Sequence, residues 1–254
     1  MFNALRSAIC LVTVTMLAGV ARAAAQTAPP SSPPAPPPPW TGSAGLGLSL
    51  NRGNTDATNL NVAFEATHGA KTPRVWIFKG LYLRGENNGT QTVDTLSLGA
   101  RHERALGPRW YAFGGVQFLK DEFKEIDYLF APGAGVGYKL VATSATTFNV
   151  DGGLGVKVEK NPGLDRRTDP VVTASDRFEH KLSKTATLTQ SFGALWKAQD
   201  FGDALYTFTA GAAAALTART QLKFELLDTY ASRPPTANVK SNDVALLTTL
   251  VYKF

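Results

Sequence analysis

The stretch that decides the fold is the last one, Asn242-Asp-Val-Ala-Leu-Leu-Thr-Thr-Leu-Val-Tyr-Lys-Phe254. Taking every second residue gives one largely apolar face, made of Val244, Leu246, Thr248, Leu250, Tyr252 and Phe254. The other face mixes Asp243 and Lys253 with apolar residues, so the period is two and the stretch is predicted to be a strand. An apolar strand left at a sheet edge invites pairing with other chains, whereas in a closed barrel the last strand pairs with the first. The sequence therefore favours a barrel with its apolar face toward lipid, and the alternative is the last strand of a soluble sandwich.

Long alternating segments continue back through the chain from this stretch. We predict twelve strands, at residues 40–52, 56–69, 74–86, 91–105, 109–121, 127–141, 145–159, 170–182, 185–199, 203–216, 219–231 and 241–254. Strands of a soluble sandwich usually run to about five or six residues. The longer segments here suit strands that cross a bilayer at a tilt.

Connections between the segments alternate between two kinds. Those near residues 71–73, 106–108, 142–144, 183–184 and 217–218 are tight, while the intervening ones are longer or rich in turn residues, notably 160–169 and 232–240. Outer-membrane barrels have short periplasmic turns and longer outer loops. The fold class is therefore predicted to be all-β, a transmembrane antiparallel up-and-down barrel of about twelve strands, or ten if two segments are loop hairpins.

Aromatic residues gather near the strand ends, as rings at the headgroup level would. Those expected near the periplasmic ends are Trp40, Trp110, Tyr138, Tyr252 and Phe254, and those expected near the outer ends are Tyr82, Phe123, Tyr128 and Tyr230.

Two segments precede the predicted barrel. Residues 1–23 have a basic start at Arg6, an apolar run and small residues around Arg22, which predicts a secretory signal peptide. Residues 24–39 are nearly all Pro, Ala and Ser, which predicts an extended periplasmic tether or, alternatively, a docking ligand for a periplasmic partner. The barrel is then assigned to residues 40–254.

Charge and cysteine content narrow the chemistry. Loss of the signal peptide removes two of 26 basic residues and none of the 20 acidic ones, lowering the formal net charge from +6 to about +4. No basic run concentrates this charge, so no nucleic-acid partner is predicted. The single cysteine, Cys10, lies in the signal peptide, which leaves no disulfide or thiolate chemistry to the exported chain.

Two parts of the chain resemble known outer-membrane proteins. Leu246, Leu250, Tyr252 and Phe254 resemble the C-terminal signal that such barrels present to the barrel assembly machinery. The Arg52-Gly-Asn-Thr-Asp56 turn, the succession of long strands and the terminal Tyr-Lys-Phe resemble the family catalogued as domain of unknown function 481, sometimes labelled salt-induced outer membrane proteins. This resemblance implies a β-barrel in the bacterial outer membrane, in contact with lipid and lipopolysaccharide, and it carries over no catalytic residue.

Charged residues on the polar face of the predicted strands are expected to line the lumen. They are Glu65, Arg101, Glu103, Asp151, Lys157, Arg177, Glu179, Lys223 and Glu225. They indicate a narrow selective channel or solute-binding barrel for a small solute or ion. Because both signs occur at similar heights, an alternative is a closed lumen and a structural or adhesive barrel that acts through its outer loops.

Other chemistry finds little support in the sequence. His68, His102 and His180 fall near predicted periplasmic strand ends, without a serine in a strained elbow, so a hydrolase is not predicted. The acids Asp121 and Glu122 belong to a predicted loop that lysines interrupt, which favours a solvated loop over a metal site. The prediction is a protein that is not an enzyme and needs no cofactor.

Overall fold

The computed structural model describes residues 40–53, 57–87, 90–234, 236 and 239–254. The predicted signal peptide and tether lie outside the described residues. The described part contains twelve strands of 12 to 17 residues. Their bounds are β1 Trp40–Arg52, β2 Ala57–His68, β3 Arg74–Asn87, β4 Thr90–Ala105, β5 Trp110–Asp121, β6 Ile126–Ala142, β7 Thr146–Lys160, β8 Arg167–Lys181, β9 Ala186–Lys197, β10 Asp200–Ala215, β11 Thr220–Ala231 and β12 Asn242–Lys253.

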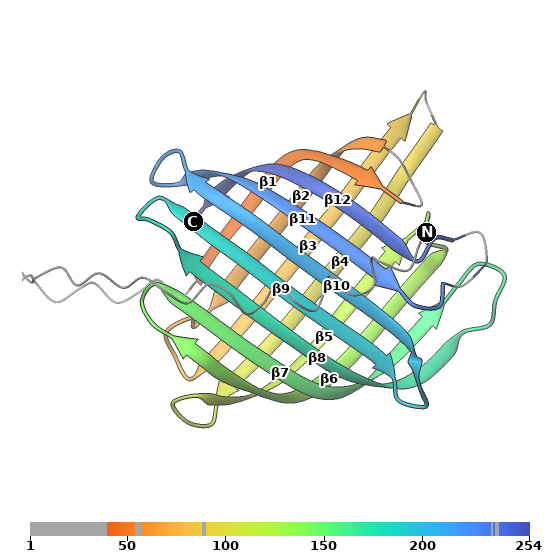
Figure 1. Cartoon of the computed structure of the whole chain (residues 1–254), viewed down its shortest axis with the longest axis horizontal. Helices are drawn as coiled ribbons and strands as arrows, with labels where there is room; N and C mark the ends of the chain where they lie inside the picture. The colour runs from red at the N-terminus through yellow and green to blue at the C-terminus, as the bar shows by residue number, and fades with distance from the viewer. Residues whose placement is uncertain (1–39, 54–56, 88–89, 235, 237–238) are drawn as a thin grey trace, which may run out of the picture. The chain divides into compact units, whose positions relative to one another are not determined.

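These strands form one closed antiparallel barrel. Each strand pairs with its neighbours in the chain, and β12 pairs with β1 (Figure 1). The β1–β12 ladder runs without a break from the pair Ser43–Lys253 to the pair Arg52–Val244. Closure leaves no strand edge unpaired, which is the condition for a sheet to lie in lipid. The predicted fold class and strand number are therefore confirmed, and the ten-strand alternative is wrong.

The terminal aromatic residue completes the closing seam. The Phe254 N–H donates to the Gly42 carbonyl at 3.0 Å, and the Gly42 N–H donates to the Phe254 carbonyl at 3.1 Å. A Cβ atom on Gly42 would stand 2.6 Å from the Phe254 ring, so the ring packs directly over this glycine. The last residue of the chain thereby fastens the last strand to the first.

The two faces of the barrel differ as the alternation predicts. Outward side chains are apolar and exposed, with Leu60 at 69 % and Leu154 at 68 % of their full exposure. Inward positions carry the charged and hydroxyl-bearing residues, such as Arg101 and Ser175. An exposed apolar belt of this kind would cost much free energy in water and none in hydrocarbon. Within the described residues, no helix is long and apolar enough to cross a membrane.

One barrel end carries Trp40, Phe254 and the turns 69–73, 106–109, 143–145, 182–185 and 216–219; we call it the terminal end and its opposite the loop end. The longest connections, 161–166 and 232–241, lie at the loop end as predicted. The predicted alternation of tight turns with longer or turn-rich connections fails at residues 198–199, which join β9 to β10 at the loop end with two residues, Ala and Gln.

Aromatic side chains collect at the terminal end. Trp110 lies against Tyr138 with ring centroids 4.9 Å apart, and Trp40, Trp110, Tyr252 and Phe254 are all about half exposed on the outside. At the loop end the prediction is partly wrong. Phe123 lines the internal cavity, and Tyr82 lies five residues before the end of β3.

Two strands, β8 and β10, begin three residues earlier than the sequence predicts. β8 continues on the loop side of Pro170, where a proline would be expected to end it. The Pro170 carbonyl accepts a hydrogen bond from the Ala198 N–H, just beyond the end of β9. The N–H that proline lacks would have faced the same side, where the β8–β9 ladder has already ended, so no ladder hydrogen bond is lost. β10 begins before a bulge between Asp200 and Ala204, whose Asp-Phe-Gly sequence resembles a turn.

Candidate functional site

The barrel interior holds a cavity of about 930 Å³. All twelve strands contribute to its wall. The lining extends from Gln221 and Lys253 near the terminal end to Asp121 and Asp243 near the loop end. The cavity therefore follows the barrel axis, and its wall contains the polar face that the strand alternation predicts.

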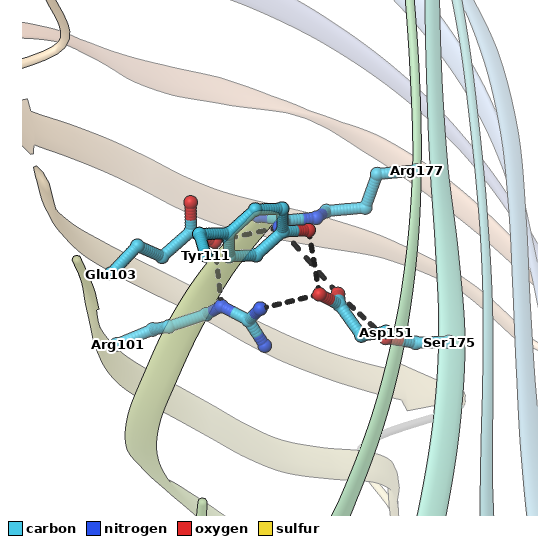
Figure 2. Close-up of polar contacts among 6 residues, drawn as sticks. All are labelled: Arg101, Glu103, Tyr111, Asp151, Ser175 and Arg177. Carbon is cyan, nitrogen blue, oxygen red and sulfur yellow. Dashed lines mark hydrogen bonds and ion pairs between the residues drawn. The ribbon is translucent and has the colours of Figure 1, made fainter. Parts of the chain in front are cut away.

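A cluster of polar side chains on β4, β5, β7 and β8 centres on Asp151 (Figure 2). The Asp151 carboxylate accepts from Arg101 Nη2 at 2.9 Å, from the Tyr111 hydroxyl at 2.6 Å and from the Ser175 hydroxyl at 3.1 Å. Arg177 Nη2 lies 3.5 Å from the same carboxylate. The Asp151 side chain is only 2 % exposed, so its charge depends on these donors rather than on water.

Glu103 links the two arginines from the other side. Its Oε1 accepts from Arg101 Nε at 2.7 Å and from Arg177 Nη2 at 2.6 Å (Figure 2). The Arg101 guanidinium also lies 3.7 Å from the centre of the Phe113 ring, a cation–π contact. Two arginines and two carboxylates thus neutralise one another in a connected network, which fixes the side chains in place.

Glycines of the intervening strand β6 make this network geometrically possible. A Cβ on Gly137 would stand 2.2 Å from the Tyr111 ring and 2.3 Å from the Asp151 carboxylate. A Cβ on Gly135 would stand 2.8 Å from the Phe113 ring. The Tyr111 and Phe113 rings therefore lie directly over β6, and Tyr111 reaches across it to Asp151 on β7.

The other predicted lumen residues are also placed on the inner face. Glu65 pairs with Lys79 at 3.3 Å, and Lys223 pairs with Glu225 at 2.5 Å. These four residues and the four charged members of the cluster all lie within five residues of the terminal end of their strands. We call these eight residues the ionic belt: Glu65, Lys79, Arg101, Glu103, Asp151, Arg177, Lys223 and Glu225.

Two predicted residues do not belong to the belt. Lys157 lies near the loop end, where it pairs with Glu159 at 2.8 Å. Glu179 lines the cavity two residues from the terminal end of β8, but it is exposed and forms no ion pair among the described residues. Lys157 differs from the belt in height. The period-two pattern predicts which way a side chain points and says nothing of its height in a tilted barrel.

The structure adds charged residues that the sequence analysis did not select. At the loop end, Lys124 lies 3.6 Å from Asp121 and 3.7 Å from Asp243, and Lys197 lies 2.8 Å from Asp169. Tyr111, Lys79 and Ser175 were missed as well; of the three, Ser175 alternates in phase with a selected residue of its own strand, Arg177. Among the described residues, no group of three or more His, Cys, Asp or Glu side chains is arranged to hold a metal ion.

The three histidines lie at the terminal end on the outer face. His68 contacts Trp40 and His102 contacts Trp76, with ring centroids 4.9 and 4.5 Å apart. His180 Nδ1 lies 2.8 Å from the Thr146 hydroxyl, and its ring stacks on Phe178. These positions suit polar groups at a membrane interface, where the apolar part of an amphipathic ring faces hydrocarbon and its polar atoms face water.

Solved structures with this architecture are outer-membrane barrels. The NanC porin matches with a TM-score of 0.56 and 10 % identity over 83 % of this chain and 100 % of its own. The COG4313 outer membrane channel from Pseudomonas putida F1 matches with a TM-score of 0.52 and 15 % identity over 90 % of this chain and 100 % of its own. The translocator domain of the autotransporter NalP from Neisseria meningitidis matches with a TM-score of 0.50 and 12 % identity over 85 % and 89 %. The chain therefore has the fold of an outer-membrane β-barrel.

Sequence comparison gives the family. Residues 44–254 match the model described as "Protein of unknown function, DUF481", and the chain belongs to this family, as the resemblance implied. No curated protein matches the sequence.

Proposed function

We propose that this protein is a narrow, selective channel of the bacterial outer membrane, with an ion-paired lumen that admits a small solute or ion. The observation that carries the proposal is the ionic belt, which lines a cavity whose wall extends toward both barrel ends. Charges facing a water-filled path set which solutes can pass. Twelve strands give a lumen narrower than that of a sixteen-stranded general porin. The proposed role is to let a small solute or ion pass through the barrel, not to catalyse a reaction.

The orientation and assembly follow from the same architecture. The terminal end, with its short turns, faces the periplasm, and the loop end faces outward toward lipopolysaccharide. Export uses the signal peptide of residues 1–23, and the barrel assembly machinery recognises the C-terminal strand through Leu246, Leu250, Tyr252 and Phe254. We also propose that salt stress induces the protein, as the label sometimes given to such proteins suggests; transcript levels measured at low and high osmolarity would test this.

The experiment is single-channel recording of the refolded mature chain in a planar bilayer. Discrete openings are expected, and Arg101→Ala and Glu103→Ala should shift ion selectivity in opposite directions because each removes one sign of charge from the lumen. Arg104→Ala is the matched control, since Arg104 is exposed on the outer face of the same strand. Folding of each variant is verified by heat-modifiable gel mobility.

A second candidate is a structural or adhesive barrel with an occluded lumen. It is favoured by the pairing of all eight belt residues, since paired side chains can bridge a narrow interior as well as line it. A silent bilayer with verified folding would support this candidate and refute the channel.

A further inference from the structure

The charges of the ionic belt cancel. Four of its members are acidic and four are basic, and each lies within ion-pair distance of a member of opposite sign. Glu179 and Lys253, which line the cavity at the same end, add one charge of each sign. A lumen that selected anions or cations would present an excess of one sign. Here a charged solute gains no net attraction at the belt, and it must compete with pairs already formed at 2.5 to 3.3 Å.

The lumen between the belt and the loop-end charges carries no charge. None of the inward side chains of the described strands at this level is Asp, Glu, Lys or Arg. On β8, β9 and β10 the inward residues are mainly hydroxyl-bearing ones: Thr173, Ser191, Thr207 and Thr209. Between them, a Cβ on Gly193 would meet no atom within 4 Å, so the wall is recessed and open at this point.

An aliphatic cluster lies nearer the loop end, three to six residues from the loop ends of its strands. Leu83 and Leu247 are buried there with Val93 and Ala245, and Leu81 and Leu227 pack against them. The lumen between the belt and the loop-end charges therefore offers hydrogen bonds in its middle and apolar contact nearer the loop end.

We infer that this middle chamber is a binding and passage site for neutral carbohydrates, an assignment that rests on the proposed channel function. A sugar is uncharged, so it crosses the belt without breaking an ion pair. Its hydroxyl groups can bond to the threonine and serine side chains, and its C–H faces can pack on the leucines. The whole lumen, of which this chamber is one part, encloses about 930 Å³, and sites that enclose small ligands occupy roughly 300–1,000 Å³.

The test compares three sugars that share one ring and differ in charge: glucose, glucuronate and glucosamine. Efflux of each labelled sugar is measured from proteoliposomes in potassium chloride with valinomycin, which holds the membrane potential at zero. A mildly acidic buffer keeps the amine protonated and the carboxyl ionised. Glucose is expected to leave roughly ten times faster than either charged sugar, a ratio that corresponds to about 1.4 kcal/mol.

Two variants locate the site. Gly193→Phe places a ring in the open recess and should slow glucose efflux severalfold, whereas Leu188→Phe places the same ring on the outer face of the same strand and should not. Glu225→Gln leaves Lys223 unpaired and should raise the ratio of glucuronate to glucose efflux.

The outcomes separate the two proposals. Ionic conductance with equal efflux of all three sugars, or faster efflux of a charged one, overturns the carbohydrate assignment and leaves the channel standing. Absence of both conductance and efflux from a folded barrel overturns both. Unchanged glucose efflux in Gly193→Phe places the passage elsewhere and also overturns the assignment.

Discussion

Replacement of Asp151 by asparagine tests whether the polar cluster acts as a unit. The side chain keeps its shape and loses its charge, so two short bonds, with Arg101 at 2.9 Å and Tyr111 at 2.6 Å, lose their charge assistance. Hydrogen bonds to charged groups are worth roughly 1.5–3 kcal/mol each. Because Arg101 is 23 % exposed, the lower end applies, and we expect a loss of about 3 kcal/mol in the free energy of unfolding.

The second variant, Arg101→Gln, turns this loss into a measurement of coupling. In the wild-type background, Arg101→Gln removes one charged hydrogen-bond donor from the Asp151 carboxylate. In the Asp151→Asn background the same substitution removes a donor from a neutral amide. The loss in the free energy of unfolding of the double variant should therefore be about 1.5 kcal/mol smaller than the sum of the two single losses. This value is within the range of interaction energies between residues in contact.

The assay is urea unfolding in lipid vesicles, followed by tryptophan fluorescence and gel mobility. Asp127→Asn serves as the control, because Asp127 is exposed near the loop end and should change stability by no more than about 0.5 kcal/mol. Strict additivity of the two single variants would refute a coupled network. A loss for Asp151→Asn no larger than that of the control would show that water, not the arginines, solvates the carboxylate.

Three further predictions concern other parts of the barrel. Gly137→Ala should lower the free energy of unfolding by about 2 kcal/mol, because the new Cβ displaces Tyr111 from the Asp151 carboxylate. Gly193→Ala should be nearly neutral in the same unfolding assay, because its Cβ meets open space. Leu154→Arg, on the lipid face near the middle of β7, should cost about 2–4 kcal/mol in vesicles, and Gln117→Arg, exposed in the lumen, should cost much less; equal costs would contradict the assignment of the two faces. Phe254→Ala should slow folding into vesicles and lower the heat-modifiable fraction, since the ring packs over the closing seam, and an unchanged folded fraction would show that the backbone bonds suffice.

The sequence by itself determined the architecture and the two faces. A period of two over segments of twelve or more residues places successive side chains on opposite faces, and turn residues mark the strand ends, so twelve strands and the lipid-facing set could be predicted. The boundaries that were wrong, at Pro170 and at the Asp200 bulge, depend on neighbouring strands. Whether a proline ends a strand depends on whether its missing N–H would have faced a paired neighbouring strand.

Only the tertiary structure decided which charges meet. Arg101 and Asp151 are 50 residues apart, and Arg177 and Glu103 are 74 apart. Their heights depend on strand tilt and on the register of every intervening pair, which alternation alone does not encode. For the same reason Lys157, inward like the others, lies at the loop end and outside the belt. The role of the β6 glycines is likewise visible only in the tertiary structure, since their missing side chains allow Tyr111 to reach across β6 to Asp151.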